Sequence, residues 1–356
     1  MTIIRRTDSR SLLLGALVLV MVAVAGLYVV KWNPYFHKAI EAAGSHSFGE
    51  PIAGEGAPRP SLGAALGYAV VYFLAVWKAM VLGLLIGSGV QALLPRRWPA
   101  RVFGKASFSS STVAAALAVP SMMCTCCAAP VAVGLKRCKV STGGAVAYLL
   151  GNPMLNPATI VFMGFVLGWG WSGLRVATAV PLVFGAAYLA DRLAPGGAEV
   201  VRTAEVAGTE GLEAAEEGNP FARWAKVLLK MALLLLPEYI VVVLALGAAQ
   251  AFVFPHLDFS SLGAGWGLLL MLWLAVAGTL FVIPTAAEIP IVQALVSAGL
   301  GPLGVGVLFT TLPAISLPSL LMAGWAFPKR VLACIALCVA LIGLLTGFVV
   351  LALGMA

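Results

Sequence analysis

The sequence predicts an all-α integral membrane protein, and its composition and its apolar runs carry that prediction. Hydrophobic residues make up 61% of the 356 residues and charged residues only 10%, whereas a soluble domain carries about 25% charged residues. Apolar runs near the roughly 20 residues that cross a bilayer as a helix recur along the chain. No run alternates apolar and polar residues as the strands of a membrane β-barrel do. Backbone groups in lipid must be satisfied internally, so these runs are expected to be helices.

The basic residues indicate how the chain is oriented in the membrane. The net charge is +8, and the basic residues cluster at the ends of apolar runs, as is typical of cytoplasmic loops. This distribution favours contact with a lipid bilayer, and nucleic acid is not expected as a partner. Arg5, Arg6 and Arg10 precede the first run, which predicts a cytoplasmic N-terminus.

Seven runs are predicted to cross the membrane. Their ranges are about 11–30, 64–94, 141–170, 174–192, 226–254, 302–325 and 331–354. The first run is expected to remain in the protein, because the apolar stretch 12–30 is longer than the apolar core of a signal peptide.

A further apolar stretch, 107–135, has a different pattern. It is interrupted by Pro120 and Pro130 and has basic residues at both ends, so the chain is expected to enter and leave the membrane on the same side. Each leg has roughly ten residues, enough for about half of the hydrocarbon core. We therefore predict a re-entrant helical hairpin with its tip at 121–129.

The two halves of the chain resemble each other. Three positions of the first half recur 160 positions later: Pro130, Gly144 and Pro153 match Pro290, Gly304 and Pro313. The stretch 264–300 would then be a second hairpin. Each repeat has three crossings and one hairpin, so the second repeat is expected to be inverted. Inverted repeats with paired broken helices are typical of secondary transporters and place the substrate site near the midplane. The alternative is that prolines are simply common in membrane helices.

The chain divides into four predicted segments. Residues 1–62 contain the first helix and an outer loop, 63–193 the first repeat, 194–225 an acidic cytoplasmic linker, and 226–356 the second repeat. The outer loop holds three residues that are read as loop residues, because their spacing is a weak signal for a metal site. They are His37, Glu41 and His46.

Three cysteines cluster at the predicted tip of the first hairpin. Cys124, Cys126 and Cys127 lie between Pro120 and Pro130. Thiolates are soft ligands that select soft metal ions and thiophilic metalloids, so these residues are predicted to bind the substrate or a metal. The alternative is packing, since a buried cysteine behaves as a small apolar residue.

Two Asn-Pro pairs, Asn152-Pro153 and Asn156-Pro157, interrupt the run 141–170. Asn is a favourable N-cap and Pro suits the first turn of a helix, so each pair can start a helix whose free N–H groups face a ligand. Asn152 and Asn156 are therefore expected to shape the substrate site. They can also satisfy backbone groups that the prolines leave free, and the two roles are compatible.

Glu288 lies at the predicted tip of the second hairpin, between Pro284 and Pro290. A carboxyl group at membrane depth is costly and points to a function. Glu288 is expected to face the cysteines in the substrate site and to exchange a proton, or bind a cation, during transport. Glu238, with Lys78 as its counter-ion, is a second residue predicted to take part in proton coupling. The alternative for Glu288 is a cap on the helix that follows.

The proline-bearing motifs of both halves resemble one known family. They are Val119-Pro120-Ser121, Cys126-Cys127-Ala128-Ala129-Pro130, Gly151-Asn152-Pro153 with Asn156-Pro157, Ile283-Pro284 with Glu288-Ile289-Pro290, and Leu312-Pro313 with Leu317-Pro318. Together they resemble the predicted permeases of the ArsP/YraQ type, which include efflux permeases for trivalent organoarsenicals. The resemblance implies export through the cytoplasmic membrane of a prokaryote. Similar members usually show a Cys-x-Cys pattern, which corresponds here to Cys124 and Cys126, whereas Cys127 looks like an addition.

These observations predict a multi-pass permease of the cell (inner) membrane that exports a thiophilic metalloid compound or a soft metal ion by secondary transport. The alternative is a membrane thiol-disulfide oxidoreductase that cycles a disulfide among the clustered cysteines. The phosphate-binding motif GxxxxGK[ST] does not occur in the sequence, so the chain is not expected to hydrolyse ATP. We expect no enzyme activity and no cofactor. The expected partners are the bilayer and a small-molecule or ion substrate, and assembly into a homo-oligomer is left open.

Overall fold

The computed structural model describes residues 9–46, 62–94, 106–194, 219–253, 267–297 and 299–355. Every regular element in these ranges is a helix, and seven helical segments are long and apolar enough to cross a membrane. Each of the seven overlaps one of the predicted crossings. Large apolar side chains cover the outside of the helices, among them Leu17, Leu74, Leu233 and Leu345, as expected of a surface that faces lipid.

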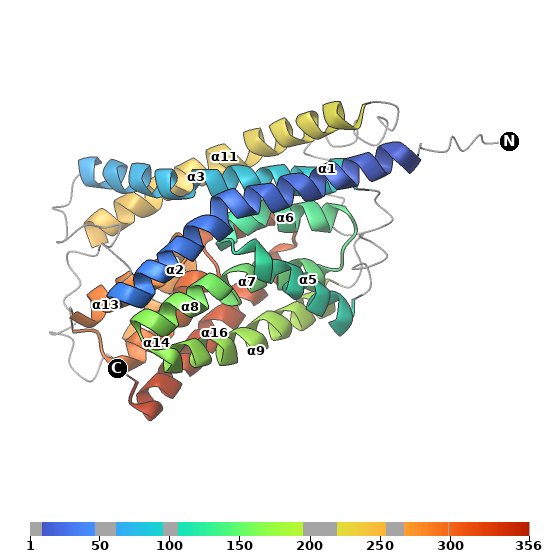
Figure 1. Ribbon diagram of the computed structural model, residues 1–356. Coiled ribbons are helices and arrows are strands. Elements are labelled where there is room, and N and C mark those ends of the chain that lie inside the picture. The colour runs from blue at the N-terminus through green and yellow to red at the C-terminus, as the bar shows by residue number, and fades with distance from the viewer. Residues whose placement is uncertain are drawn as a thin grey trace.

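The first helical segment is longer than the sequence predicts. α1 (Ser9–Leu27) continues through a π-helical turn, η1 (Tyr28–Trp32), into α2 (Asn33–Ser45), which crosses the molecule as one diagonal rod (Figure 1). The predicted end at residue 30 and the loop that follows are therefore wrong. Pro34 does not end the helix because it occupies the first turn of α2, where its missing N–H group has no partner to lose.

The change affects the three residues assigned to the outer loop. His37 and Glu41 lie on α2, and His46 is its C-cap in the left-handed conformation. The His46 N–H donates to the carbonyl of Ala42 at 2.9 Å, so this carbonyl in the last turn of α2 has a partner. The prediction that these three residues lie in a loop is therefore wrong, because the helix extends to Ser45.

The first half contains one long helix, a pair of short helices, and a broken helix. Its elements are α3 (Leu62–Leu93), α5 (Phe108–Ser121), α6 (Thr125–Arg137), α7 (Thr142–Met154), α8 (Pro157–Val166) and α9 (Trp169–Leu193). The non-helical link between α5 and α6 is only 122–124, shorter than the predicted tip of 121–129. The difference arises because Pro120 and Pro130 both lie inside helices.

The second half has the same kinds of element. They are α11 (Pro220–Val253), α12 (Gly267–Leu280), α13 (Glu288–Ser297), α14 (Pro302–Ala314), α15 (Leu317–Gly324) and α16 (Lys329–Leu353). α11 begins at Pro220 rather than at 226, so the end of the predicted linker 194–225 is helical. Residues 195–218 of that linker lie outside the described residues.

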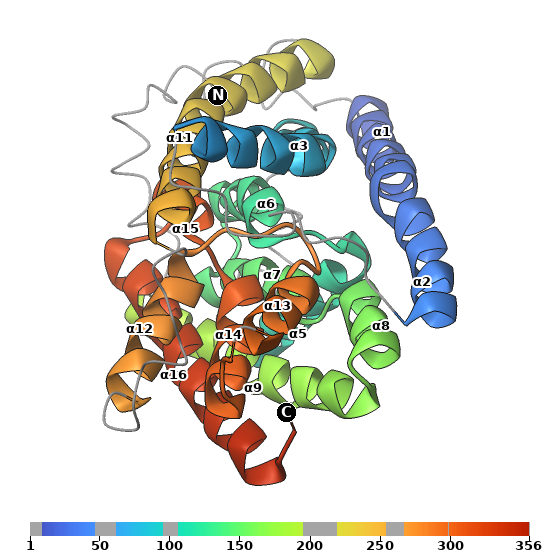
Figure 2. The same cartoon turned by 90° about the vertical axis from the view of Figure 1, so that its left-hand side faces the viewer.

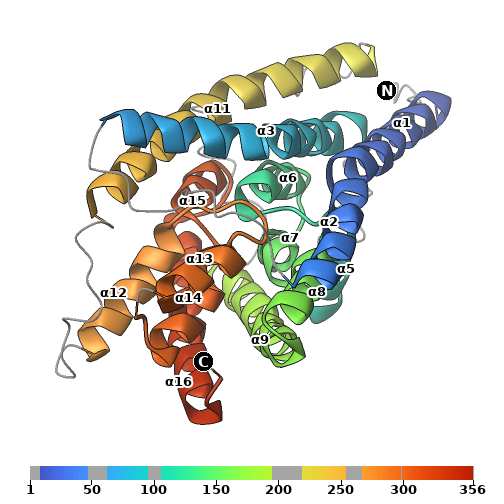
Figure 3. The ribbon, with the colours of Figure 1, turned by 60° about the vertical axis from the view of Figure 1, so that its left-hand side comes forward.

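Two short helices of the first half, α6 and α7, lie inside a shell of other helices. α3 and α11 run side by side, α6 lies below α3, and α7 lies below α6 (Figure 3). α14 packs on α16, and the rod of α1 and α2 lies against α3 and α8 at the edge of the molecule (Figure 2). This arrangement buries Met123 and Cys124 of the α5–α6 link and the first helix of each broken pair, α7 and α14.

Glycines allow α6 to approach α3 closely. A Cβ atom added at Gly87 would lie 2.5 Å from the carbonyl oxygen of Pro130, and one added at Gly134 would lie 2.5 Å from the carbonyl oxygen of Gly87. Gly83, one turn earlier on α3, faces the carbonyl of Cys127. Small residues four apart are the usual means by which membrane helices pack backbone to backbone. The cysteine-bearing helix is thus held directly on the backbone of α3.

Candidate functional site: a thiol cluster and a buried ion pair

Three thiols converge where α6 begins. Cys124 is the N-cap residue of α6 in an extended conformation, and Cys126 and Cys127 lie in its first turn. The Sγ atom of Cys124 lies 3.0 Å from that of Cys126 and 3.0 Å from that of Cys127, and the last two are 4.0 Å apart. All three thiols are free and buried. In the described ranges, they are the one group of three Cys, His, Asp or Glu side chains placed to hold a single ion.

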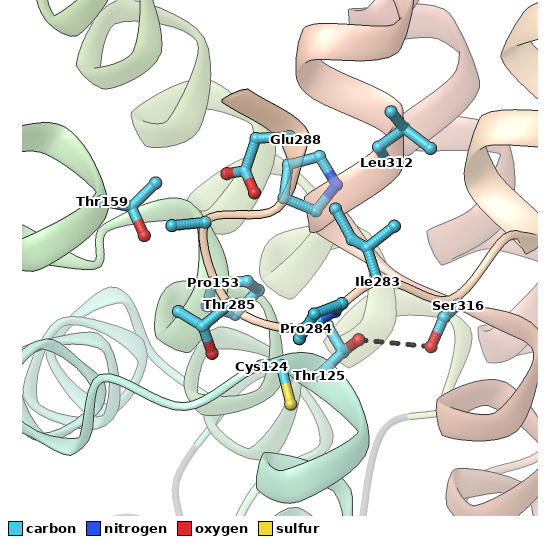
Figure 4. A pocket seen from close by; sticks show the side chains of 12 residues that line it. Cys124, Thr125, Pro153, Thr159, Ile283, Pro284, Thr285, Glu288, Leu312 and Ser316 are labelled. Carbon is cyan, nitrogen blue, oxygen red and sulfur yellow. Dashed lines mark hydrogen bonds between the residues drawn. The ribbon is translucent and has the colours of Figure 1, made fainter. Parts of the chain in front are cut away.

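A small cavity lies between these cysteines and the second half of the chain (Figure 4). The empty space between its lining atoms amounts to about 290 Å³, open space included. The lining combines the two stretches predicted as hairpins with the breaks of both broken helices: Cys124, Thr125, Pro153, Thr159, Ile283, Pro284, Thr285, Ala286, Glu288, Leu312, Pro313 and Ser316. The hydroxyl groups of Thr125 and Ser316 meet across the cavity wall at 3.4 Å. Cys124 and Glu288, which are far apart in the sequence, therefore face one cavity.

Glu288 forms a buried ion pair that the sequence analysis did not predict. Its Oε1 atom accepts a hydrogen bond from Nη2 of Arg175 at 3.2 Å, and the two side chains are 1% and 0% exposed. The other carboxylate oxygen, Oε2, is buried and has no hydrogen-bond partner. An arginine inside an apolar run is itself a signal of function, and this signal in the run 174–192 was missed.

Arg175 also bonds to the backbone of α7 and α14, the first helix of each broken pair. Its Nη2 atom donates to the carbonyl of Pro153 and its Nη1 atom to the carbonyl of Phe309, each at 2.9 Å. Pro313 follows Phe309 by four positions inside α14 and lacks the N–H group that would otherwise bond to its carbonyl. Pro153 lies in the last turn of α7, where carbonyl groups have no partner within the helix. The guanidinium group supplies the missing donors in both halves of the chain.

The two asparagines stabilise the walls of the cavity from behind. Asn152 accepts a hydrogen bond from the Met123 N–H at 3.3 Å and donates one to the Tyr148 carbonyl at 2.9 Å. Asn156 caps α8 by accepting from the N–H groups of Ala158 and Thr159. Both side chains are fully buried and neither lines the cavity. Asn156 thus holds Thr159, which lines the cavity, and Asn152 holds Met123, the neighbour of Cys124.

The π-helical turn of the first segment contacts both hairpin stretches. Lys31 donates to the hydroxyl of Thr285 at 3.3 Å and to that of Tyr35 at 3.1 Å. The indole N–H of Trp32 donates to the carbonyl of Pro120 at 2.7 Å. Both residues were expected in the outer loop, because nothing in the local sequence signals a π-helical turn. Such turns are frequent at functional sites.

Glu238 and Lys78 lie away from the cavity. The carboxylate of Glu238 accepts a hydrogen bond from the indole N–H of Trp325 at 3.0 Å. Lys78 is exposed and its ammonium group lies 6.0 Å from the ring centroid of Trp77. The expected ion pair between Glu238 and Lys78 is absent from the part of the chain that the structure describes.

Comparison with known proteins identifies the family. A family model described as predicted permease, ArsP_1, matches residues 13–150 and 121–352. The chain belongs to this family of predicted permeases. It is also 45% identical over 328 residues to the UPF0718 protein YraQ of Escherichia coli (strain K12), a match that covers 92% of each chain. No solved structure matches. The protein is therefore a multi-pass membrane permease with a small-molecule or ion substrate, as the motif resemblance implied.

Proposed function

We propose that this permease exports a thiophilic metalloid compound, such as a trivalent organoarsenical, or a soft metal ion, by secondary transport. The observation that carries the proposal is the convergence of three thiols, 3.0 to 4.0 Å apart, at the start of a half-length helix. Cys124 adds a sulfur ligand to a cavity that residues of both halves line. Sulfur ligands grouped in this way suit soft, thiophilic centres.

The chemistry of binding is a reversible exchange of oxygen for sulfur. A trivalent compound R–As(OH)₂ would react with two thiols, forming two As–S bonds and releasing two molecules of water that take up the two thiol protons. Hydrolysis would reverse the reaction and return the thiols. The third thiol offers a further ligand as the substrate moves between sulfurs. No redox partner is needed, because arsenic and sulfur keep their oxidation states.

Glu288 is proposed to couple the cycle to protons. Its free carboxylate oxygen is buried at the cavity, and its other oxygen binds Arg175. Gain of a proton would remove the charge that this arginine attracts, so protonation and movement of the second half can be linked. Glu238, which bonds to Trp325 outside the cavity, is the less favoured of the two carboxylates.

The proposed arrangement around the site follows the sequence analysis. Segments 63–193 and 226–356 are taken as two inverted repeats, each with one re-entrant hairpin, in the inner membrane of a prokaryote with a cytoplasmic N-terminus. The order of elements, with a broken helix in each half, supports this assignment. The site would then lie near the midplane.

Replacement of the thiols tests the proposed function. The double variant Cys126→Ser and Cys127→Ser leaves at most one sulfur ligand, so cells that express it should lose about tenfold or more of the resistance to trivalent arsenicals or mercury that the wild type confers. Growth across a concentration series is the measurement, with the amount of protein in the membrane determined by immunoblot. The matched control is Cys334→Ser with Cys338→Ser, which alters two half-buried thiols of α16.

Resistance that is unchanged in the first variant would remove the thiols from the mechanism. The alternative function, a thiol-disulfide oxidoreductase using the same cysteines, predicts a different result. It requires a disulfide that forms and breaks during turnover, which alkylation of free thiols before and after substrate addition would reveal by mass spectrometry.

A further inference from the structure

Lys31 is a buried cation next to the cavity wall and forms no ion pair with a carboxylate of the described residues. Its side chain is 5% exposed, and its ammonium group binds two neutral hydroxyls, those of Tyr35 and Thr285. It also lies 5.1 Å from the centroid of the Tyr35 ring. No carboxylate within the described ranges forms an ion pair with it. An ammonium group in a low-dielectric interior is costly unless something offsets its charge.

The charges around the thiols do not cancel. Arg175 and Glu288 neutralise each other as a pair, and Lys31 adds one further positive charge. The groups that interact electrostatically with Lys31 include the thiols of Cys124 and Cys127. With the three thiols protonated, the described part of the site has a net charge of +1 before a substrate binds.

This charge has a consequence for what can bind. Two unit charges a few ångströms apart interact by several kcal/mol at the effective dielectric of a protein interior, so a positive site opposes a cation and attracts an anion. Lys31 is also placed to act on the cavity itself, because Thr285, which it binds, belongs to the cavity wall. Its position is set by the π-helical turn of the first segment.

We propose that Lys31 is a substrate-binding residue that selects thiophilic compounds carrying a negative charge over soft cations. The inference rests on the proposed function, since it names the class of thiophilic substrate that the same site takes. The ammonium group would contact the anionic part of the compound while the thiols bind its soft centre. A bound anion would bring the site to neutrality.

Thiol reagents of opposite charge test this proposal without a transported substrate. The full chain, purified in detergent with Cys124 as its only cysteine, is treated with a sulfonate-bearing and with a trimethylammonium-bearing methanethiosulfonate. In each reaction the thiolate sulfur forms a disulfide with the reagent and methanesulfinate leaves. The ratio of the two rates cancels the fraction of ionised thiol and reports the electrostatic potential at Cys124. A neutral methyl reagent provides the reference rate.

The anionic reagent should react faster than the cationic one by about tenfold or more. Lys31→Gln should remove most of that preference and Lys31→Arg should keep it, whereas Lys78→Gln, at an exposed position on α3, should leave it unchanged. Equal rates in the parent protein would overturn the proposal even if every Lys31 variant failed to fold. Reaction with the neutral reagent alone, or with none of the three, would also overturn it, because a charged compound could then not reach the site.

The outcomes separate this inference from the proposed function. Loss of arsenical resistance on replacement of Cys126 and Cys127, combined with equal rates of the charged reagents, would retain the thiol site and reject the role of Lys31. Unchanged resistance with a strong preference for the anionic reagent would instead retain an anion-selective site and reject thiol-mediated export.

Discussion

Arg175 and Glu288 combine structural and chemical roles in single side chains. Arg175 supplies donors to carbonyls of α7 and α14 and to one oxygen of Glu288. A buried pair of this kind adds little net stability compared with an apolar pair, but loss of one partner leaves an uncompensated charge and typically costs about 3–5 kcal/mol. Because Arg175 keeps its bonds to the two carbonyls, it can remain in place while Glu288 gains or loses a proton.

Glu288→Gln should abolish the dependence of transport on a proton gradient. The amide keeps the shape of the side chain and can still accept a hydrogen bond from Arg175, but it cannot exchange a proton at membrane depth. In everted vesicles that are acidic inside, wild-type uptake of a trivalent arsenical should fall when the gradient is collapsed with an ionophore. Uptake by the variant should be the same with and without the gradient.

The matched control for this prediction is Glu238→Gln, which alters the carboxylate that bonds to Trp325 outside the cavity. Its uptake should still respond to the gradient. If the Glu288 variant still responds to the gradient and the Glu238 variant does not, the residue that couples transport to protons is Glu238 and not Glu288.

Among the elements, α3 and α6 show how glycine spacing positions the thiols. Gly83 and Gly87 are one turn apart on α3 and face the backbone of α6 from Cys127 to Pro130. Bulkier residues would push α6 outward and move the thiol cluster with it. The π-helical turn η1 also helps to position the site, because Lys31 and Trp32 bind the two hairpin stretches.

Gly87→Leu should therefore destabilise the protein substantially. A Cβ atom there already meets the Pro130 backbone, which cannot move as an exposed side chain can, and overpacking typically costs about 1–3 kcal/mol or more. The midpoint of thermal unfolding in detergent should fall by several degrees, as followed by the monodisperse fraction after heating. The control is Gly67→Leu on the same helix, where nothing lies within 4 Å of an added Cβ. Equal midpoints for both variants would show that the α3–α6 contact is not tight.

The whole molecule has two halves that contain the same kinds of helix, and both halves line one cavity. Each half supplies a broken helix and a stretch of two short helices, and lining residues come from both. The first segment, α1 to α2, lies at the edge of the molecule, outside the two halves (Figure 2). Its Lys31 bonds to Thr285 in the cavity wall. A site built between two halves can open to either side of a membrane when one half moves against the other.

The proposed inversion of the halves fixes the side on which each connection lies. Green fluorescent protein inserted in the linker 194–225 should fluoresce, because that segment is predicted to be cytoplasmic. Alkaline phosphatase fused after residue 356, or inserted between 254 and 263, should be active, because both positions are predicted to be outside. A fluorescent fusion and an inactive phosphatase at the C-terminus would contradict the inverted arrangement, provided that immunoblots show equal amounts of each fusion.

Much of the fold could be predicted because its signals are local. Apolar length marks the crossings, and proline marks the breaks, as in the interruption between α7 and α8 at Leu155 and Asn156. The limits of the hairpin tip were less accurate, since Pro130 is accommodated inside α6. The end of the first helix was wrong because Pro34, which reads as a loop signal, instead fits the first turn of α2.

The same distinction applies to the site: its local features could be predicted, and its long-range contacts could not. Sequence by itself determined the fold class, the thiol cluster and Glu288, since hydrophobic length, neighbouring cysteines and a carboxyl group in an apolar run can each be read within a few residues. Only the tertiary structure decided what these groups face. Glu288 meets Arg175 across 113 positions, and Lys31 meets Thr285 across 254. Contacts of this range depend on how the helices pack, and packing is a property of the assembled chain that no short segment encodes.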